Sequence, residues 1–249
     1  MDNIYKPPQS DLAPELPETG PYGSIEKGIN GDYELSIGDT IKEAWDLTRR
    51  AKGKINSAIF LSYITVIPIL FITGPLLAIT GLSKNLIASI FANFLIQIVL
   101  MGISYPLWAG VFMIGIRRSV QIGFPIKIIY GYFGYAVPLL ITGVIMTILI
   151  FLGTILLLLP GLYLIFAYML ALPLVVEKGL SPWQALETSR KTITHKWFKF
   201  VGLLIVLWLL LCISALPLGI GLIWTMPLAL VSMGIAYRNM FGVENLQNK

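Results

Sequence analysis

Four long stretches of the chain carry no charged residue, and they set the expected secondary structure. They cover residues 55–83, 85–116, 128–176 and 200–237, which is 29, 32, 49 and 38 residues. A helix needs about 20 apolar residues to cross the hydrocarbon core of a bilayer. We therefore expect one membrane span in each of the first two stretches and two in each of the others, which makes six.

These spans are expected to be helices, because membrane β-strands alternate polar and apolar residues and runs such as 155–159 do not. Gly153–Thr154 is the expected turn in the 49-residue stretch, and residues 216–219, Leu-Pro-Leu-Gly, are the expected turn in the last one. The predicted fold is an all-α, polytopic membrane protein whose six transmembrane helices form three hairpins.

The charged residues between these stretches predict the orientation in the membrane. If the polar segments alternate between two sides, 17 of the 18 Lys and Arg residues and all 13 acidic residues fall on one side. The other side has Lys84 alone. Cytoplasmic loops carry the excess of basic residues, so we expect both termini in the cytoplasm. The first 54 residues contain no apolar core of a signal peptide, and the first span is expected to be an uncleaved anchor.

Composition supports the membrane interpretation and excludes several other classes. Of 249 residues 56% are hydrophobic and 12% are charged, whereas soluble domains have about 25% charged residues. One cysteine, Cys212, and one histidine, His195, exclude a disulfide scaffold and the usual four-ligand zinc site. The net charge of +5 comes from basic residues at helix ends, which anchor topology and meet anionic lipids, so no nucleic-acid partner is expected.

The chain divides into a leader and a membrane domain. Residues 1–35 are rich in proline and acidic residues and show no helical or strand period. We expect them to form a disordered cytoplasmic leader. Residues 36–249 are expected to form the six-span helical domain.

An internal repeat predicts two helices at the cytoplasmic surface. Residues 38–50 and 179–191 match at three positions and are conservatively related at five. In each copy a capping box can open a helix, formed by Thr40 with Glu43 and by Ser181 with Gln184. We expect amphipathic interfacial helices over residues 39–52 and 181–197, each leading into a span. Chance similarity of two short amphipathic helices is the alternative.

The motifs in the second half of the chain are similar to those of a protein group. The segments Leu159-Pro160-Gly161-Leu162-Tyr163 and Ala171 to Ser181, followed by Ala185-Leu186 and Ser189, carry the resemblance. The chain resembles a group of bacterial six-helix inner-membrane proteins, mostly uncharacterised and similar to the membrane domain of some glycerophosphodiester phosphodiesterases. The resemblance implies a bacterial inner (plasma) membrane location. It implies no phosphodiesterase activity, because that catalytic domain is absent from this sequence.

Two sets of polar residues are candidate sites. Ser89, Asn93 and Gln97 form one stripe on the second span at helical spacing. They indicate either the lining of a substrate path or hydrogen bonds between helices. Glu177 and Arg190 lie close in sequence at the membrane surface. They indicate either an ion pair that fixes the interfacial helix or a ligand-responsive pair.

The function expected from the residues is non-enzymatic. No predicted span contains an ionisable residue, which argues against an ion-coupled transporter. No hydrolase, nucleotide-binding or metalloprotease motif is present, so neither a catalytic residue nor a cofactor or metal is predicted. We expect the protein to act through the lipid bilayer, through a membrane-protein partner or as a homo-oligomer. A channel or transporter for a small neutral or lipid-like solute is the alternative.

Overall fold

The computed structural model describes residues 22–81 and 85–244. Helices make up 82% of the structure, and no strand occurs in these two ranges. Five segments are long and apolar enough to cross a membrane: Lys52–Leu76, Leu86–Ser119, Ile126–Leu156, Leu158–Glu177 and Trp197–Ala215. The all-helical fold with several membrane-compatible helices is therefore confirmed.

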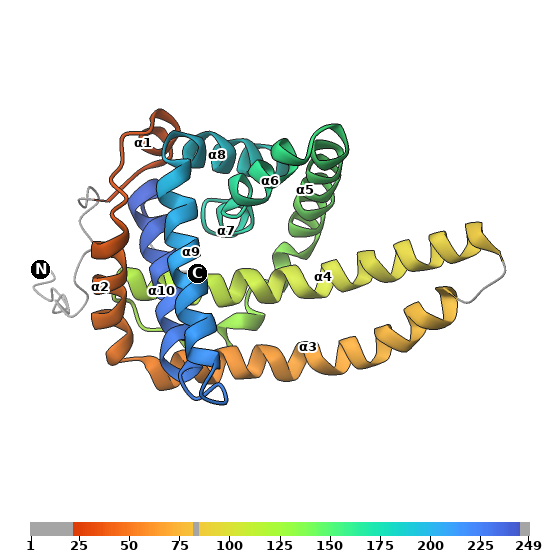
Figure 1. The fold of residues 1–249 in the computed structure, drawn as a ribbon, viewed down its shortest axis with the longest axis horizontal. Coiled ribbons are helices and arrows are strands. Elements are labelled where there is room, and N and C mark those ends of the chain that lie inside the picture. The colour runs from red at the N-terminus through yellow and green to blue at the C-terminus, as the bar shows by residue number, and fades with distance from the viewer. Residues whose placement is uncertain (1–21, 82–84, 245–249) are drawn as a thin grey trace, which may run out of the picture.

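The helices follow one another with short connections (Figure 1). The α-helices are α1 (Ile25–Asn30), α2 (Ile37–Arg49), α3 (Lys52–Gly81), α4 (Leu86–Ser119), α5 (Ala136–Leu156), α6 (Leu158–Ala167), α7 (Ala171–Glu177), α8 (Pro182–His195), α9 (Trp197–Ala215) and α10 (Leu222–Phe241). Two 3₁₀ turns, η1 (Ile126–Tyr130) and η2 (Phe133–Tyr135), lead into α5.

The core is built around α10, which packs most extensively against α4 and also against α1, α2, α3 and α9. Two glycines let α4 and α10 touch backbone to backbone. A Cβ atom on Gly234 would lie 2.1 Å from the carbonyl oxygen of Gly115, and one on Gly115 would lie 2.4 Å from that of Leu230. Such a contact is closer than any side chain permits, so this crossing depends on glycine.

The pair of α3 and α4 extends away from the other helices (Figure 1). These are the two longest helices, with 30 and 34 residues, or about 45 and 51 Å at 1.5 Å per residue. Their outer halves expose many large apolar side chains, including Phe71, Ile72, Ile79, Leu86, Ile87, Ile90, Phe91 and Phe94. An apolar surface of this extent on two helices suits a hydrocarbon environment.

Both helices of the internal repeat are present, with shifted boundaries. α8 begins as predicted: the amide of Ser181 donates to the side chain of Gln184 at 3.2 Å, and Pro182 is the first helical residue. The first copy begins earlier than residue 39. There Ser36 is the N-cap and its hydroxyl accepts from the amide of Asp39, while Thr40 is buried inside α2. The Ser36 side chain satisfies the amide of Asp39, which would otherwise have no partner. The helix therefore begins about one turn before the expected capping box of Thr40 and Glu43.

Of the expected leader over residues 1–35, residues 22–35 are described and include α1, and residues 1–21 lie outside the described ranges. Ser24 caps α1, and Gly31 ends it in the left-handed conformation with φ 76°. Tyr33 and Leu35 are then buried. Local caps and two apolar anchors order this segment against α8 and α10, despite its polar composition.

The turn between α5 and α6 lies at Leu157 rather than at Gly153–Thr154. Gly153 faces Gly161, and a Cβ atom on Gly161 would lie 2.1 Å from the hydroxyl of Thr154. Gly153 and Gly161 allow α5 and α6 to pack closely, and the helix α5 continues past Gly153 to Leu156. The predicted turn at residues 216–219 is confirmed, with Leu218 and Gly219 both at positive φ.

Candidate functional site

One site is an apolar groove between α3, α4, α6, α9 and α10, with a cavity volume of about 790 Å³. Twenty residues line it and none of them is charged. The lining includes Trp108, Val111, Phe166, Leu204, Trp208 and Met233. Small-molecule sites typically enclose about 300–1,000 Å³, so the groove is large enough for a ligand.

The groove forms where two tryptophan side chains stay largely outside the core. Trp108 on α4 and Trp208 on α9 are 66% and 63% exposed, although both line the groove. Met169 and Met226 add flexible thioether side chains, which adapt to irregular apolar shapes. The groove is therefore open on one side and lined by groups that contact hydrocarbon.

The groove offers little polar chemistry. Ser62 is its one aliphatic hydroxyl, and that hydroxyl donates to the carbonyl of Ile59 in its own helix at 2.6 Å. Tyr63 adds one phenol hydroxyl, and the lining residues include no carboxylate, histidine, lysine, arginine or thiol. The arrangement can hold an apolar chain.

The polar stripe of the second span lies outside the groove, on the outer half of α4. Ser89 is buried and donates to the carbonyl of Asn85, while the amide of Asn93 donates to the carbonyl of Ser89 at 2.8 Å. Gln97 is exposed. Ser89 and Asn93 therefore bond to the backbone of the preceding turn, and the stripe does not line the groove.

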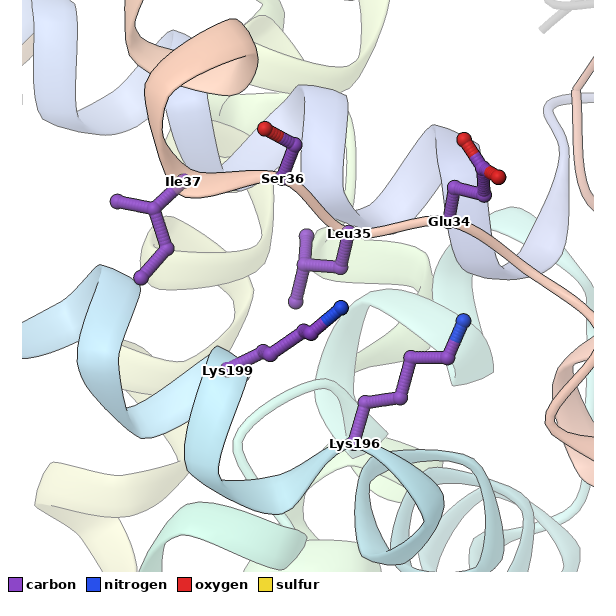
Figure 2. Close-up of a pocket in the computed structure, with 6 residues that line it drawn as sticks. All are labelled: Glu34, Leu35, Ser36, Ile37, Lys196 and Lys199. Carbon is purple, nitrogen blue, oxygen red and sulfur yellow. The ribbon is translucent and has the colours of Figure 1, made fainter.

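A second, smaller pocket of about 500 Å³ has a polar wall (Figure 2). The segment 34–37 forms one side, and Lys196 and Lys199, at the start of α9, form the other. Both ammonium groups point toward the segment 34–37 (Figure 2). The sequence predicts basic residues at helix ends. It does not predict that residues 34–37 face the basic start of α9.

Glu177 is fully buried at the end of α7, and its side chain binds the end of the described chain at residues 237 and 244. Its carboxylate accepts from the hydroxyl of Tyr237 at 2.8 Å and from the backbone amide of Glu244 at 2.6 Å. Lys178 lies 3.5 Å from the same carboxylate. A buried carboxylate needs such donors, because burial without them penalises its charge strongly.

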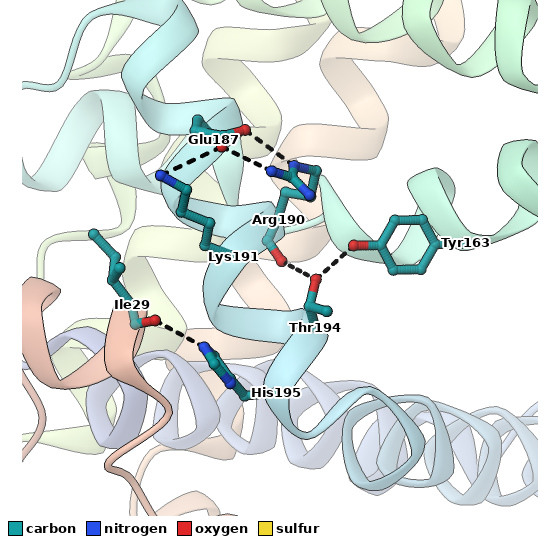
Figure 3. Close-up of polar contacts among 7 residues, drawn as sticks. All are labelled: Ile29, Tyr163, Glu187, Arg190, Lys191, Thr194 and His195. Atoms are coloured by element: carbon teal, nitrogen blue, oxygen red, sulfur yellow. Dashed lines mark hydrogen bonds and ion pairs between the residues drawn. The ribbon is translucent and has the colours of Figure 1, made fainter.

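Arg190 belongs to a different network, on α8 (Figure 3). Its guanidinium binds both carboxylate oxygens of Glu187, at 3.0 and 2.7 Å, and Lys191 lies 3.4 Å from the same group. The hydrogen bond from Arg190 lowers the pKa of Glu187, and that same bond raises the pKa of Arg190. The structure thus does not pair Glu177 with Arg190, because Glu187 is one helical turn from Arg190 and takes its place.

The same helix holds α1 in place (Figure 3). His195 donates from Nε2 to the carbonyl of Ile29 at 2.8 Å. The hydroxyls of Tyr163 and Thr194 are hydrogen-bonded, and Thr194 also donates to the carbonyl of Arg190. These contacts join α1, α6 and α8 into one layer and use the polar groups for packing.

Sequence reasoning missed an ion pair between α2 and α10, in which the arginine is buried and the glutamate is partly exposed. The guanidinium of Arg238 donates to both carboxylate oxygens of Glu43, at 2.7 and 2.9 Å, and to the carbonyl of Ser119 at 2.6 Å. It also lies 4.4 Å from the centre of the Tyr22 ring. Glu43 and Arg238 are 195 positions apart, so no local spacing could have indicated the pair.

Comparisons with models of known protein families, with curated proteins and with solved structures found no match. Within residues 22–81 and 85–244, no group of three or more His, Cys, Asp and Glu side chains is arranged to hold a metal ion. The geometry of the groove is therefore the main basis for a functional proposal.

Proposed function

We propose that the protein is a multi-pass membrane protein without enzymatic activity, and that its groove holds a hydrocarbon chain of a bilayer lipid. The observation that carries this proposal is the charge-free lining of the groove. A groove between membrane helices lies at the depth of the acyl chains, and acyl chains are the most abundant apolar ligand there. Trp108 and Trp208 provide broad apolar contact surface, and the methionines adapt to the shape of what they contact.

The proposal includes a sixth span, formed by α10. This helix has 20 residues, about 30 Å at 1.5 Å per residue, which matches the hydrocarbon thickness. Its residues are less apolar than those of the other spans because most of them contact other helices rather than lipid. Arg238, in its last turn, pairs with Glu43 on α2 and marks the cytoplasmic edge.

The six spans are proposed to form three hairpins, α3 with α4, α5 with α6 and α7, and α9 with α10. In this arrangement α2 and α8 are amphipathic helices at the cytoplasmic surface, and both termini are cytoplasmic. The location proposed is a bacterial inner membrane, on the basis of the resemblance of the motifs in the second half of the chain. The bilayer itself is then the first partner of the protein.

The retention of lipid by the purified protein tests the proposal. Ala229 lines the groove, and the variant Ala229→Trp would fill it with an indole ring. We expect the wild-type chain, purified in a mild detergent, to retain a phospholipid that native mass spectrometry detects. We expect Ala229→Trp to retain about tenfold less, which corresponds to a loss of about 1.4 kcal/mol of binding free energy.

The matched control is Ala78→Trp, because Ala78 is an exposed alanine on the outer half of α3 and does not line the groove. It adds the same ring to the apolar surface without filling the groove. Equal lipid retention by Ala229→Trp and the wild type, with both proteins folded, would contradict the proposed function.

A further inference from the structure

The smaller pocket carries an inference of its own, because its positive charge is not neutralised within the described chain. Lys199 is exposed, and no carboxylate in the described ranges pairs with it. Lys196 donates to the backbone carbonyl of Tyr33, which uses one of its three donors. Two ammonium groups therefore face one cavity of about 500 Å³ with donors to spare.

The one acidic residue of the lining does not cancel this charge. Figure 2 shows that the carboxylate of Glu34 points away from both ammonium groups. Ser36 also points away, and its hydroxyl caps α2 by accepting from the amide of Asp39. The groups that remain on the lysine side are two cations and the apolar side chains of Leu35 and Ile37.

The wall opposite the lysines is held in a fixed position. Leu35 is 2% exposed, and the hydroxyl of Tyr33 donates to the carbonyl of Thr192 on α8 at 2.8 Å. Burial raises the pKa of Tyr33 to about 12, so this hydroxyl stays a donor at neutral pH. The ammonium of Lys196 lies 4.7 Å from the centre of the Tyr33 ring, which further orients it.

We propose that this pocket binds a phosphate group, and that in the membrane the phosphate belongs to an anionic phospholipid. Lys199 lies in the first turn of α9, a candidate span, and a basic residue there is at the depth of lipid headgroups. The inference rests on the membrane placement proposed above, but not on the groove, since the two sites share no lining residue.

Titration of the full-length protein in detergent with phosphatidylglycerol, followed by native mass spectrometry, tests the inference. Each lysine near a headgroup contributes enough to change affinity about fivefold. We expect Lys199→Gln to bind phosphatidylglycerol about fivefold more weakly than the wild type, and the double variant with Lys196→Gln about 30-fold more weakly. Lys199→Arg keeps the charge and is expected to bind as the wild type does.

The control is Lys54→Gln, which removes one exposed positive charge at the start of another span. We expect it to bind phosphatidylglycerol as the wild type does.

A second titration uses inorganic phosphate alone. If free phosphate binds with the same dependence on Lys199 and phosphatidylglycerol does not, the phosphate site stands and its ligand is a soluble phosphate.

Unchanged affinity in the folded Lys199→Gln protein for both ligands, or an equal loss in Lys54→Gln, would overturn the inference. Lys199 is exposed, so the single variant is expected to fold even if the double variant does not. Failure of the groove proposal looks different, because Ala229→Trp tests retention of the co-purified lipid and leaves the lysine pocket intact.

Discussion

One buried side chain, Arg238, joins three separate parts of the molecule. It binds Glu43 on α2, the carbonyl of Ser119 at the end of α4 and the ring of Tyr22 ahead of α1. The two partners of the ion pair are not equivalent: the Arg238 side chain is 6% exposed and that of Glu43 is 42% exposed. Glu43 can regain water when the pair is broken, whereas the guanidinium cannot.

This asymmetry predicts the effect of Glu43→Gln. The substitution leaves a buried cation with a neutral partner, and hydrogen bonds to charged groups contribute about 1.5–3 kcal/mol. Because Glu43 is partly exposed, we expect the free energy of unfolding to fall by about 1–2 kcal/mol. Denaturation in detergent micelles, followed by circular dichroism, measures this change.

The control for this prediction is Asp46→Asn on the same helix. Asp46 is exposed, and no ion pair involves it within the described ranges. Its substitution is expected to change stability by less than about 0.5 kcal/mol. Equal effects of the two variants would mean that the ion pair adds nothing to stability.

At the scale of the elements, the crossing of α4 and α10 depends on contact between their backbones. The crossing is possible because Gly115 and Gly234 have no side chain where the helices touch. Any added methyl group must push the helices apart, and α10 contacts so many elements that the displacement cannot stay local.

We therefore expect Gly234→Ala to lower the free energy of unfolding by more than about 3 kcal/mol, as overpacking in a rigid core does at its upper range. Gly102→Ala on α4 is the matched control, because nothing lies within 4 Å of the position of its Cβ atom. In that helix interior alanine is expected to be neutral or stabilising by up to about 1 kcal/mol. Similar stability of both variants would exclude close packing at Gly234.

The residue ranges of the helices could be predicted where the local absence of charge determines them. Charge-free stretches predict helices because lipid excludes charge and requires the backbone to bond internally. The turn at Leu157 could not be predicted, because Gly153 looks the same in sequence whether it breaks a helix or packs against Gly161. The ordering of residues 22–35 depends on burial against α8 and α10, which no local pattern reports.

The candidate sites show the same division between local and distant causes. The pair of Glu187 with Arg190 has an i, i+3 spacing that helix geometry favours, so the sequence contained that signal. The pair of Glu43 with Arg238 and the groove require helices far apart in sequence to meet. Such contacts depend on how the helices pack, and a single sequence does not specify that locally.

For the whole molecule, the proposed topology makes a prediction about accessibility. In a Cys212→Ser background, a single cysteine introduced at Lys84 is expected to react with a membrane-impermeant maleimide added outside intact cells. A single cysteine at Ser10 is expected to react only after the membrane is opened, because the positive-inside rule places it in the cytoplasm. Gel-shift labelling measures both. Protection at residue 84 together with labelling at residue 10 in intact cells would reverse the orientation.

The central position of α10 also has a consequence for how the protein is made. α10 is the last helix along the described chain, yet α1, α2, α3, α4 and α9 all pack against it. During synthesis the preceding helices are therefore made before α10 is available, and the face of α4 at Gly115 stays uncovered until then. The packing around α10 can form only when residues 222–241 have left the ribosome, so translation stalled before them would yield helices without these contacts.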